Sequence, residues 1–206
     1  MKAKTLIYKD NKVPAAPQEE LLASHHPLLD EFLEGGIRWG EISEWGIPWG
    51  QALREVVLPF LVSAQKNQTP KPWILWIYGQ KDVCINPLAW HARGLDLSHM
   101  RFAHTQQPVH ELKPIFLSPF FRIIVIDSVR NLSDEECAFL ARQARRQQQL
   151  LFLIRPFLLS PQQGNVWAKT RINCWRSNEQ QRIYAKIVKG RSPRQVTWLE
   201  TALYQW

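Results

Sequence analysis

Three short runs of apolar residues mark the positions of buried strands. Residues 73–78 read WILWIY, residues 122–127 read RIIVID, and residues 150–154 read LLFLI. Runs without polar alternation are typical of strands that other elements cover on both faces. A shorter strand is predicted over residues 41–45. Because helical patterns separate these strands, the chain is predicted to fold as an α/β protein with a mainly parallel central sheet flanked by helices.

The predicted helices are recognised by apolar residues at helical spacing. Such a pattern starts at Gln51, and Pro59 inside it predicts a kink. Another helix begins at Ser133, which is placed to form a capping box with Glu136. One stripe of this helix is apolar and is predicted to face the core. Another stripe is cationic and is predicted to bind DNA or a partner: Arg142, Arg145 and Arg146. A short helix is expected over residues 28–33.

The C-terminal part of the chain alternates apolar and polar residues, which is typical of strands with one exposed face. Residues 170–175 read TRINCW and residues 181–188 read QRIYAKIV, with a turn predicted between them at residues 177–179. One face of this antiparallel hairpin is apolar. The other face offers cations and aromatic rings that are candidates for binding DNA or a partner: Arg171, Trp175, Arg182, Tyr184 and Lys186.

Positive charge is concentrated in one part of the sequence. The 206-residue chain has a formal net charge of +8, and residues 142–194 contain twelve Lys and Arg against one acid, Glu179. A segregated field of this kind favours nucleic acid or an acidic protein face. The candidate cations of this region therefore also include Lys189, Arg191 and Arg194.

Other features of the sequence exclude several classes of protein. No apolar run is long enough to cross a membrane, and the first thirty residues lack the apolar core of a signal peptide, so a cytoplasmic protein without membrane contact is expected. Cys84, Cys137 and Cys174 lie far apart and are expected to be buried reduced thiols. We expect no metal site. The proline-bearing residues 1–27 are predicted to form a flexible arm.

The stretch EWGIPWGQAL, residues 44–53, has the glycines of a nucleotide-binding loop without its chemistry. Such loops place a lysine on the β- and γ-phosphates and a hydroxyl on magnesium, positions that hold Gln51 and Ala52 here. Asp127 stands at a strand end, where an aspartate would hold the magnesium water shell. The predicted vestigial site, which should need no cofactor, consists of Gly46, Gly50, Gln51, Ala52 and Asp127. Two tryptophans are expected to fill the volume of the missing nucleotide: Trp45 and Trp49.

In their order, these motifs resemble the RecA ATPase core. Residues 29–46, LDEFLEGGIRWGEISEWG, are similar to its entry, residues 73–102 resemble its next segment, and RIIVIDSV resembles its magnesium-binding strand. The resemblance covers roughly residues 28–191 and implies one RecA-like domain over residues 28–206. Where RecA carries a catalytic glutamate, this chain reads Gly79-Gln80-Lys81. A RecA-like shell without enzymatic activity is therefore expected.

Among RecA relatives, the chain is most similar to the ImuA-type accessory proteins of SOS-induced mutagenesis. The similarity lies in Ile154-Arg155-Pro156 after the third buried strand and in Lys189-Gly190-Arg191 after the hairpin. It implies a non-catalytic factor in translesion DNA synthesis that binds a polymerase-like scaffold protein, an error-prone polymerase and RecA, with DNA at the basic face. Analogy with RecA also suggests self-association. Two alternatives remain: a SulA-type division inhibitor that binds FtsZ, and a divergent ATPase.

Overall fold

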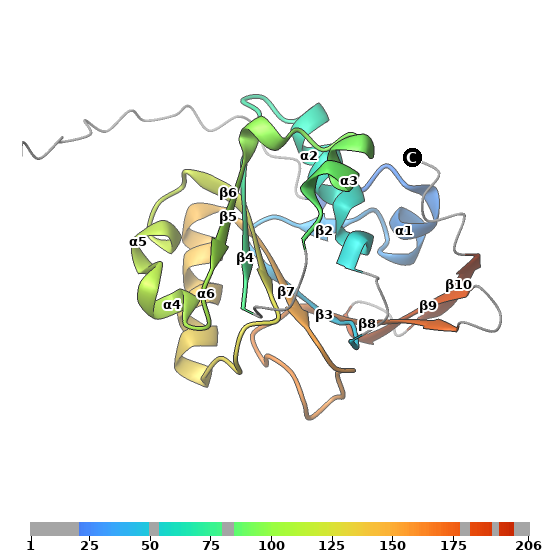
Figure 1. The fold of residues 1–206 in the computed structure, drawn as a ribbon. Helices are drawn as coiled ribbons and strands as arrows, with labels where there is room; N and C mark the ends of the chain where they lie inside the picture. Colours follow the sequence, from blue (N-terminus) through green and yellow to red (C-terminus); the bar gives the residue numbers. More distant parts are fainter. Residues whose placement is uncertain (1–20, 50–53, 80–84, 178–181, 191–193, 200–206) are drawn as a thin grey trace, which may run out of the picture.

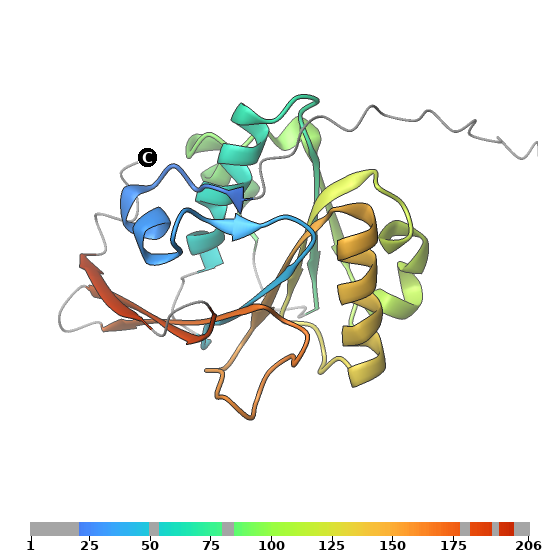
Figure 2. The same ribbon diagram turned by 180° about the vertical axis from the view of Figure 1, so that it is seen from behind.

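A computed structural model describes residues 21–49, 54–79, 85–177, 182–190 and 194–199. The chain forms an α/β structure in which helices cover both faces of one large mixed sheet (Figures 1 and 2). Most of the strands run parallel, and the C-terminal strands are antiparallel, which confirms the predicted fold class at this level.

The eight-stranded sheet has the order β10-β9-β8-β3-β7-β6-β4-β5. Its strands are β3 (Ile42–Gly46), β4 (Trp73–Tyr78), β5 (Met100–His104), β6 (Phe121–Asp127), β7 (Leu150–Arg155), β8 (Thr170–Ser177), β9 (Arg182–Lys189) and β10 (Gln195–Leu199). Strands β3 to β8 run parallel to one another. Strand β8 belongs to both parts of the sheet, because it pairs parallel with β3 and antiparallel with β9. Strand β10 extends the predicted hairpin by a third strand.

Helices lie on both faces of the sheet. One face is covered by α1 (Pro27–Phe32), α2 (Leu58–Asn67) and α3 (Pro87–Ala92), and the other by α4 (Pro108–Glu111), α5 (Lys113–Phe116) and α6 (Asp134–Gln147). Two 3₁₀ turns complete the first layer: η1 (Arg54–Val57) and η2 (Leu97–His99). Alternate residues of β4, β6 and β7 enter the two cores, which explains why these strands are apolar throughout.

The predicted start of the helix at Ser133 is confirmed. Ser133 and Glu136 form the capping box of α6, with the Ser133 N–H donating to Glu136 Oε2 at 2.8 Å. Burial alone would raise the pKa of Glu136, but hydrogen bonds from Ser133 and Arg130 outweigh it and lower the pKa. Pro59 lies in the first turn of α2, directly after the 3₁₀ turn η1, where a proline costs no hydrogen bond within α2.

Residues before the predicted domain boundary at residue 28 already take part in the fold. Strand β1 (Leu21–Leu22) pairs antiparallel with β2 (Ile37–Arg38), and the Leu22 side chain is buried in the core beside α1. Ser24 also donates through its N–H and hydroxyl to Asp30, both at 2.7 Å. Residues 21–27 are thus part of the fold, while residues 1–20 lie outside the described part of the chain.

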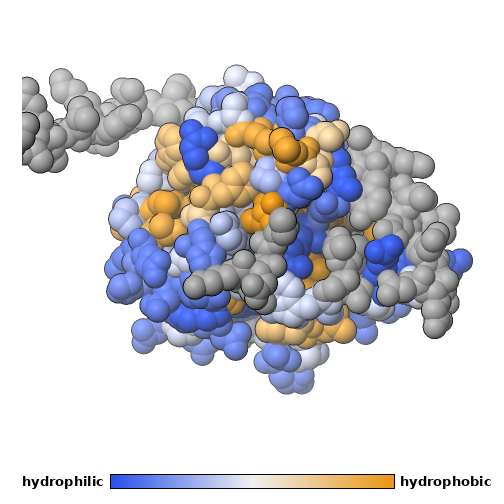
Figure 3. Space-filling view, viewed as in Figure 1, coloured by the Kyte–Doolittle hydropathy of each residue, from blue (hydrophilic) through white to orange (hydrophobic). Residues whose placement is uncertain are grey.

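Strand β5 forms one edge of the sheet, and much of its surface is exposed. Apolar patches lie over this part of the molecule (Figure 3). Exposed apolar side chains here include Phe102 and Phe120, and Trp73 stacks on Phe120 with ring centroids 5.3 Å apart. Among the described helices, none is long and apolar enough to cross a membrane.

Candidate functional site

The predicted nucleotide site lies at the carboxyl edge of the parallel strands, where β3, β4, β6 and β7 end. Asp127 closes β6 and is paired in register with Tyr78 of β4 and Ile154 of β7. Crevices at this edge are the usual ligand sites of parallel α/β sheets. Asp127 is only 1% exposed, however, so its carboxylate already has its partners inside the protein.

Arg54, at the start of η1, is the cationic partner of Asp127. Its Nε donates to the two carboxylate oxygens at 2.9 and 3.0 Å, and its terminal nitrogen donates to Ser128 Oγ at 2.9 Å. The Ser128 hydroxyl in turn donates to Asp127 at 2.7 Å, and Ser128 has a left-handed backbone (φ +54°). These contacts use both oxygens of Asp127. A magnesium water shell could reach the carboxylate only after Arg54 had moved away.

The two tryptophans beside the loop do not act alike. Trp49 is half exposed, and the Arg54 guanidinium lies over its indole ring. The guanidinium carbon is 4.4 Å from the ring centroid, so the ring supports the cation by a cation–π contact. Trp45 is fully buried on β3 and packs on Phe60 and near Phe152 in the core. The expectation that both rings fill a nucleotide volume is therefore wrong for Trp45. Gly50, Gln51 and Ala52 lie outside the described residues.

Two glycines at this edge permit the backbone to pack closely. A Cβ on Gly46 would lie 2.3 Å from Asn173 Oδ1 and 2.7 Å from the carbonyl oxygen of Phe157. A Cβ on Gly79 would lie 2.4 Å from Val129 Cα. Gly46 therefore makes room for the connection after β7, which is a different role from the predicted one in a phosphate loop. Gly79 makes room for the chain that follows Asp127.

A buried charged cluster lies behind this edge, on β3, β7 and β8. Glu44 has no exposed surface and accepts from Arg155 Nε at 2.9 Å and from the backbone N–H of Asn165 at 2.6 Å. Arg171 Nε lies 3.7 Å from the same carboxylate and donates to the Asn165 carbonyl at 3.1 Å. Arg171 is 3% exposed. The prediction that Arg171 belongs to an exposed binding face is therefore wrong, because a buried carboxylate and three carbonyl oxygens hold its guanidinium inside.

The hairpin face keeps part of its predicted character. Trp175 and Tyr184 are partners across β8 and β9 and stack with ring centroids 5.4 Å apart and planes 7° apart. Each ring thus covers one face of the other, and both are half-buried. Arg182 and Lys186 are exposed on the same face of β9. This face therefore presents two exposed cations beside a stacked aromatic pair.

The remaining predicted cations fall into several environments. Lys189 donates to the carbonyl oxygen of Val166 at 2.8 Å, and Arg194 pairs with Glu34 at 2.8 Å and donates to the Glu31 carbonyl. Arg194 is thus held against α1 and the turn that follows it, where its charge is paired with a carboxylate. Arg191 lies outside the described residues. The predicted cationic stripe of α6 is exposed as expected: Arg142, Arg145 and Arg146.

The residues between β7 and β8, which we call the β7–β8 segment (residues 156–169), divide these cations into two surfaces. In both views the segment projects below the sheet, between α6 and the strands β9 and β10 (Figures 1 and 2). The arginine stripe of α6 and the hairpin face are therefore separate regions. A ligand would have to span the β7–β8 segment to contact both.

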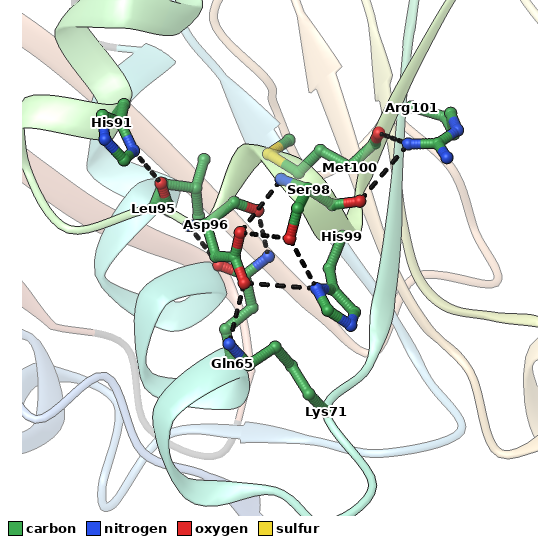
Figure 4. Close-up of polar contacts among 9 residues, drawn as sticks. All are labelled: Gln65, Lys71, His91, Leu95, Asp96, Ser98, His99, Met100 and Arg101. Carbon is green, nitrogen blue, oxygen red and sulfur yellow. Dashed lines mark hydrogen bonds and ion pairs between the residues drawn. The ribbon is translucent and has the colours of Figure 1, made fainter.

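A Ser-His-Asp cluster at the turn before β5 is not a catalytic triad (Figure 4). His99 Nδ1 contacts both Asp96 Oδ2 at 3.2 Å and Ser98 Oγ at 3.0 Å, whereas a triad uses opposite ring nitrogens for the acid and the nucleophile. The Asp96 carboxylate caps η2 and pairs with Lys71 at 2.7 Å. The Lys71 ammonium, and after it the hydrogen bonds from Ser98, lower the pKa of Asp96 far below its usual range. The cluster stabilises the turn.

The described thiols are also structural. Burial raises the pKa of Cys137 to about 11 and raises the pKa of Cys174 further, so both stay protonated and unreactive near neutral pH. Cys84 lies outside the described residues. Among the residues that the structure describes, no group of three or more His, Cys, Asp and Glu side chains could hold a metal ion.

Two partnerships in this region were not predicted from the sequence. The Arg54–Asp127 pair joins residues 73 positions apart, and the Glu44–Arg155 pair joins residues 111 positions apart. A signal for the second pair exists in the sequence, because a charged residue in a strand that is otherwise buried requires a buried counter-charge. Glu44 lies in such a strand, and Arg155 follows the apolar run LLFLI directly.

Comparison with known proteins adds no assignment to this geometry. No protein-family model matches the chain, and no curated protein matches its sequence.

Proposed function

We propose that this chain is a non-catalytic, RecA-like accessory protein of the ImuA type, which supports SOS-induced translesion DNA synthesis by binding other molecules. Its partners would be a polymerase-like protein of the mutagenesis complex, RecA, and DNA at the basic hairpin face. The mainly parallel sheet and the order of strand, loop and helix around β3 support the RecA-like part of the proposal. So does the position of Asp127 at the carboxyl end of β6, on the same edge as the loop.

The observation that carries the non-catalytic part is the Arg54–Asp127 pair. An ATPase of this class needs an aspartate available to the metal, whereas Asp127 is buried and bound to a guanidinium from its own chain. The internal cation also supplies positive charge where a lysine and magnesium would otherwise act. A protein with such a site retains the shell of an ATPase as a binding surface.

Replacing Arg54 tests this assignment. Arg54→Gln should lower the free energy of unfolding by about 2 kcal/mol, because it leaves the buried Asp127 carboxylate without its cation. Arg93→Gln, which removes a more exposed ion pair to Glu55, should cost less than about 1 kcal/mol. Urea unfolding measures both.

The same proteins can be titrated with magnesium and a fluorescent ATP analogue. The wild-type chain should give no saturable signal at micromolar concentrations. Saturation there would contradict the proposal and favour the divergent ATPase.

The basic hairpin face gives an independent test. The double variant Arg182→Glu, Lys186→Glu should bind a fluorescent oligo-dT more weakly than the wild type, because two exposed cations can no longer displace counterions. The plot of log K against log salt should become less steep. The magnitude of its negative slope should decrease by about 1.4, because each phosphate contact on a single strand contributes roughly 0.7.

A matched control reverses the charge of two exposed lysines on other elements. It is the double variant Lys66→Glu on α2 and Lys113→Glu on α5. This control should keep most of the wild-type affinity. An equal loss in both double variants would show that net charge alone is responsible, and the hairpin face would then have no special role in DNA binding.

A further inference from the structure

The β7–β8 segment is irregular in secondary structure but tightly fixed in space. Asn173 on β8 accepts from the Leu159 N–H at 2.7 Å and donates to the Leu159 carbonyl at 2.8 Å. Arg171 donates to the carbonyl oxygens of Ser160 and Pro161. At the far end, Glu44 accepts from the Asn165 N–H. Buried side chains of β3 and β8 thus hold the segment at three places along its length.

This fixed segment exposes large apolar side chains. Val166 is 61% exposed, Trp167 is 48% exposed, and Leu158 is also exposed. An apolar patch appears in the lower part of Figure 3, above a hydrophilic tip, in the region where Figure 1 places the segment. Exposed tryptophan and aliphatic groups on a rigid frame are typical of protein-binding surfaces, because little conformational freedom is lost on binding.

The charge around the segment is positive and incompletely neutralised. Glu44 is the one carboxylate of the cluster, and it faces Arg155 and Arg171. Lys169 and Lys189 add two further cations, and both are exposed. Burial lowers the pKa of Lys189, and repulsion from Arg171 and Lys169 lowers it further. An anionic partner would relieve this repulsion, so the surface is complementary to acidic groups.

We propose that the β7–β8 segment is a preformed docking site for an acidic, apolar segment of a partner protein. The partner's apolar side chains would contact Val166 and Trp167, while its carboxylates would pair with Lys169 and Lys189. The exposed aliphatic side chains of Leu158 and Val166 favour a protein over nucleic acid, because single-stranded nucleic acid is held by aromatic stacking and phosphate contacts. This inference rests on the proposed function, because it names the surface by which an accessory protein would bind its partner.

The test uses the full-length chain and a fluorescein-labelled peptide in which leucine and phenylalanine alternate with aspartate and glutamate. Fluorescence anisotropy should show saturable binding, and a peptide with lysine in place of the acids should not bind. Val166→Ser with Trp167→Ala should weaken binding about tenfold or more, and Lys169→Gln with Lys189→Gln should weaken it in a salt-dependent manner. Leu88→Ser and Lys66→Gln, which alter an exposed apolar residue and a cation elsewhere, should have no effect.

Three outcomes would overturn this proposal. They are the absence of peptide binding, equal loss in the control variants, and displacement of the bound peptide from the wild-type protein by oligo-dT, which would assign the segment to nucleic acid. Each of these outcomes leaves the ATP-analogue titration and the hairpin variant untouched, so the docking site can fail while the proposed function stands. Saturable binding of the ATP analogue, in contrast, would contradict the proposed function and would leave the peptide-binding site standing.

Discussion

Replacing Glu44 by alanine is expected to lower the free energy of unfolding by about 4 kcal/mol, because it leaves two arginines buried without their carboxylate. Arg155 and Arg171 are 6% and 3% exposed, so water cannot compensate for the lost partner. The substitution also removes the acceptor of the Asn165 N–H. Few single substitutions in this chain should cost as much.

Equilibrium urea unfolding measures this loss. Glu44→Gln keeps a hydrogen-bonding side chain of similar size and should cost about half as much, which gives a second reading if the alanine variant fails to fold. The control is Glu41→Gln, which removes a partly exposed partner 3.9 Å from Arg38 and should cost about 0.5 kcal/mol or less. Equal losses for Glu44→Ala and Glu41→Gln would contradict the assignment of Glu44 as the centre of a buried cluster.

Replacing Gly46 by alanine should cost about 3 kcal/mol, although the change adds one methyl group. The new Cβ would meet Asn173 Oδ1 at 2.3 Å, the Phe157 carbonyl oxygen at 2.7 Å and the Leu159 nitrogen at 2.9 Å. Two of these atoms belong to the backbone, so a side-chain rotation cannot relieve the overlap. The β7–β8 segment would have to move away from β3.

Thermal unfolding of Gly46→Ala should be compared with that of Ser43→Ala on the same strand. The buried Ser43 hydroxyl has no hydrogen-bond partner among the described residues, so its removal should be nearly neutral. A near-neutral Gly46→Ala would mean that the connection after β7 is farther from β3 than the structure has it. The role of Gly46 in close packing would then be wrong.

The central strands were predictable because their environment leaves a simple pattern. Strand β4 matches its predicted range, and β6 and β7 each extend one residue beyond theirs, at Phe121 and Arg155. These strands are covered on both faces, so nearly every position must be apolar. The start of α6 was predictable for a local reason, because a capping box needs only residues three positions apart.

Elements at the edges of the sheet left no such pattern. Strand β5 (MRFAH) is exposed along most of its length and was not predicted, and the two-residue strands β1 and β2 are too short to show periodicity.

Arg171 was misassigned for a related reason. Alternation correctly placed it opposite the apolar face of β8, but that second face is covered locally by the β7–β8 segment. Alternation cannot reveal such local cover.

Residues of the candidate site could be predicted only where their type and their position in a strand were sufficient evidence. Asp127 was recognised from its place at a strand end, and the arginine that neutralises it was not, because the pair joins residues 73 positions apart on η1 and β6. The contacts of Gly46 likewise depend on residues more than one hundred positions away. Long-range contacts of this kind follow from the assembled sheet and are not encoded in local spacing.

The anchoring of the β7–β8 segment has a consequence for the order in which the chain folds. Its contacts to Glu44 span 121 positions, and those to Asn173 require β8 to be paired with β3 already. Contacts of such high separation close long loops and cost more chain entropy than the contacts within a helix or between neighbouring residues. We therefore expect the surface through which the protein is proposed to bind its partner to be complete only when β3 and β8 are paired.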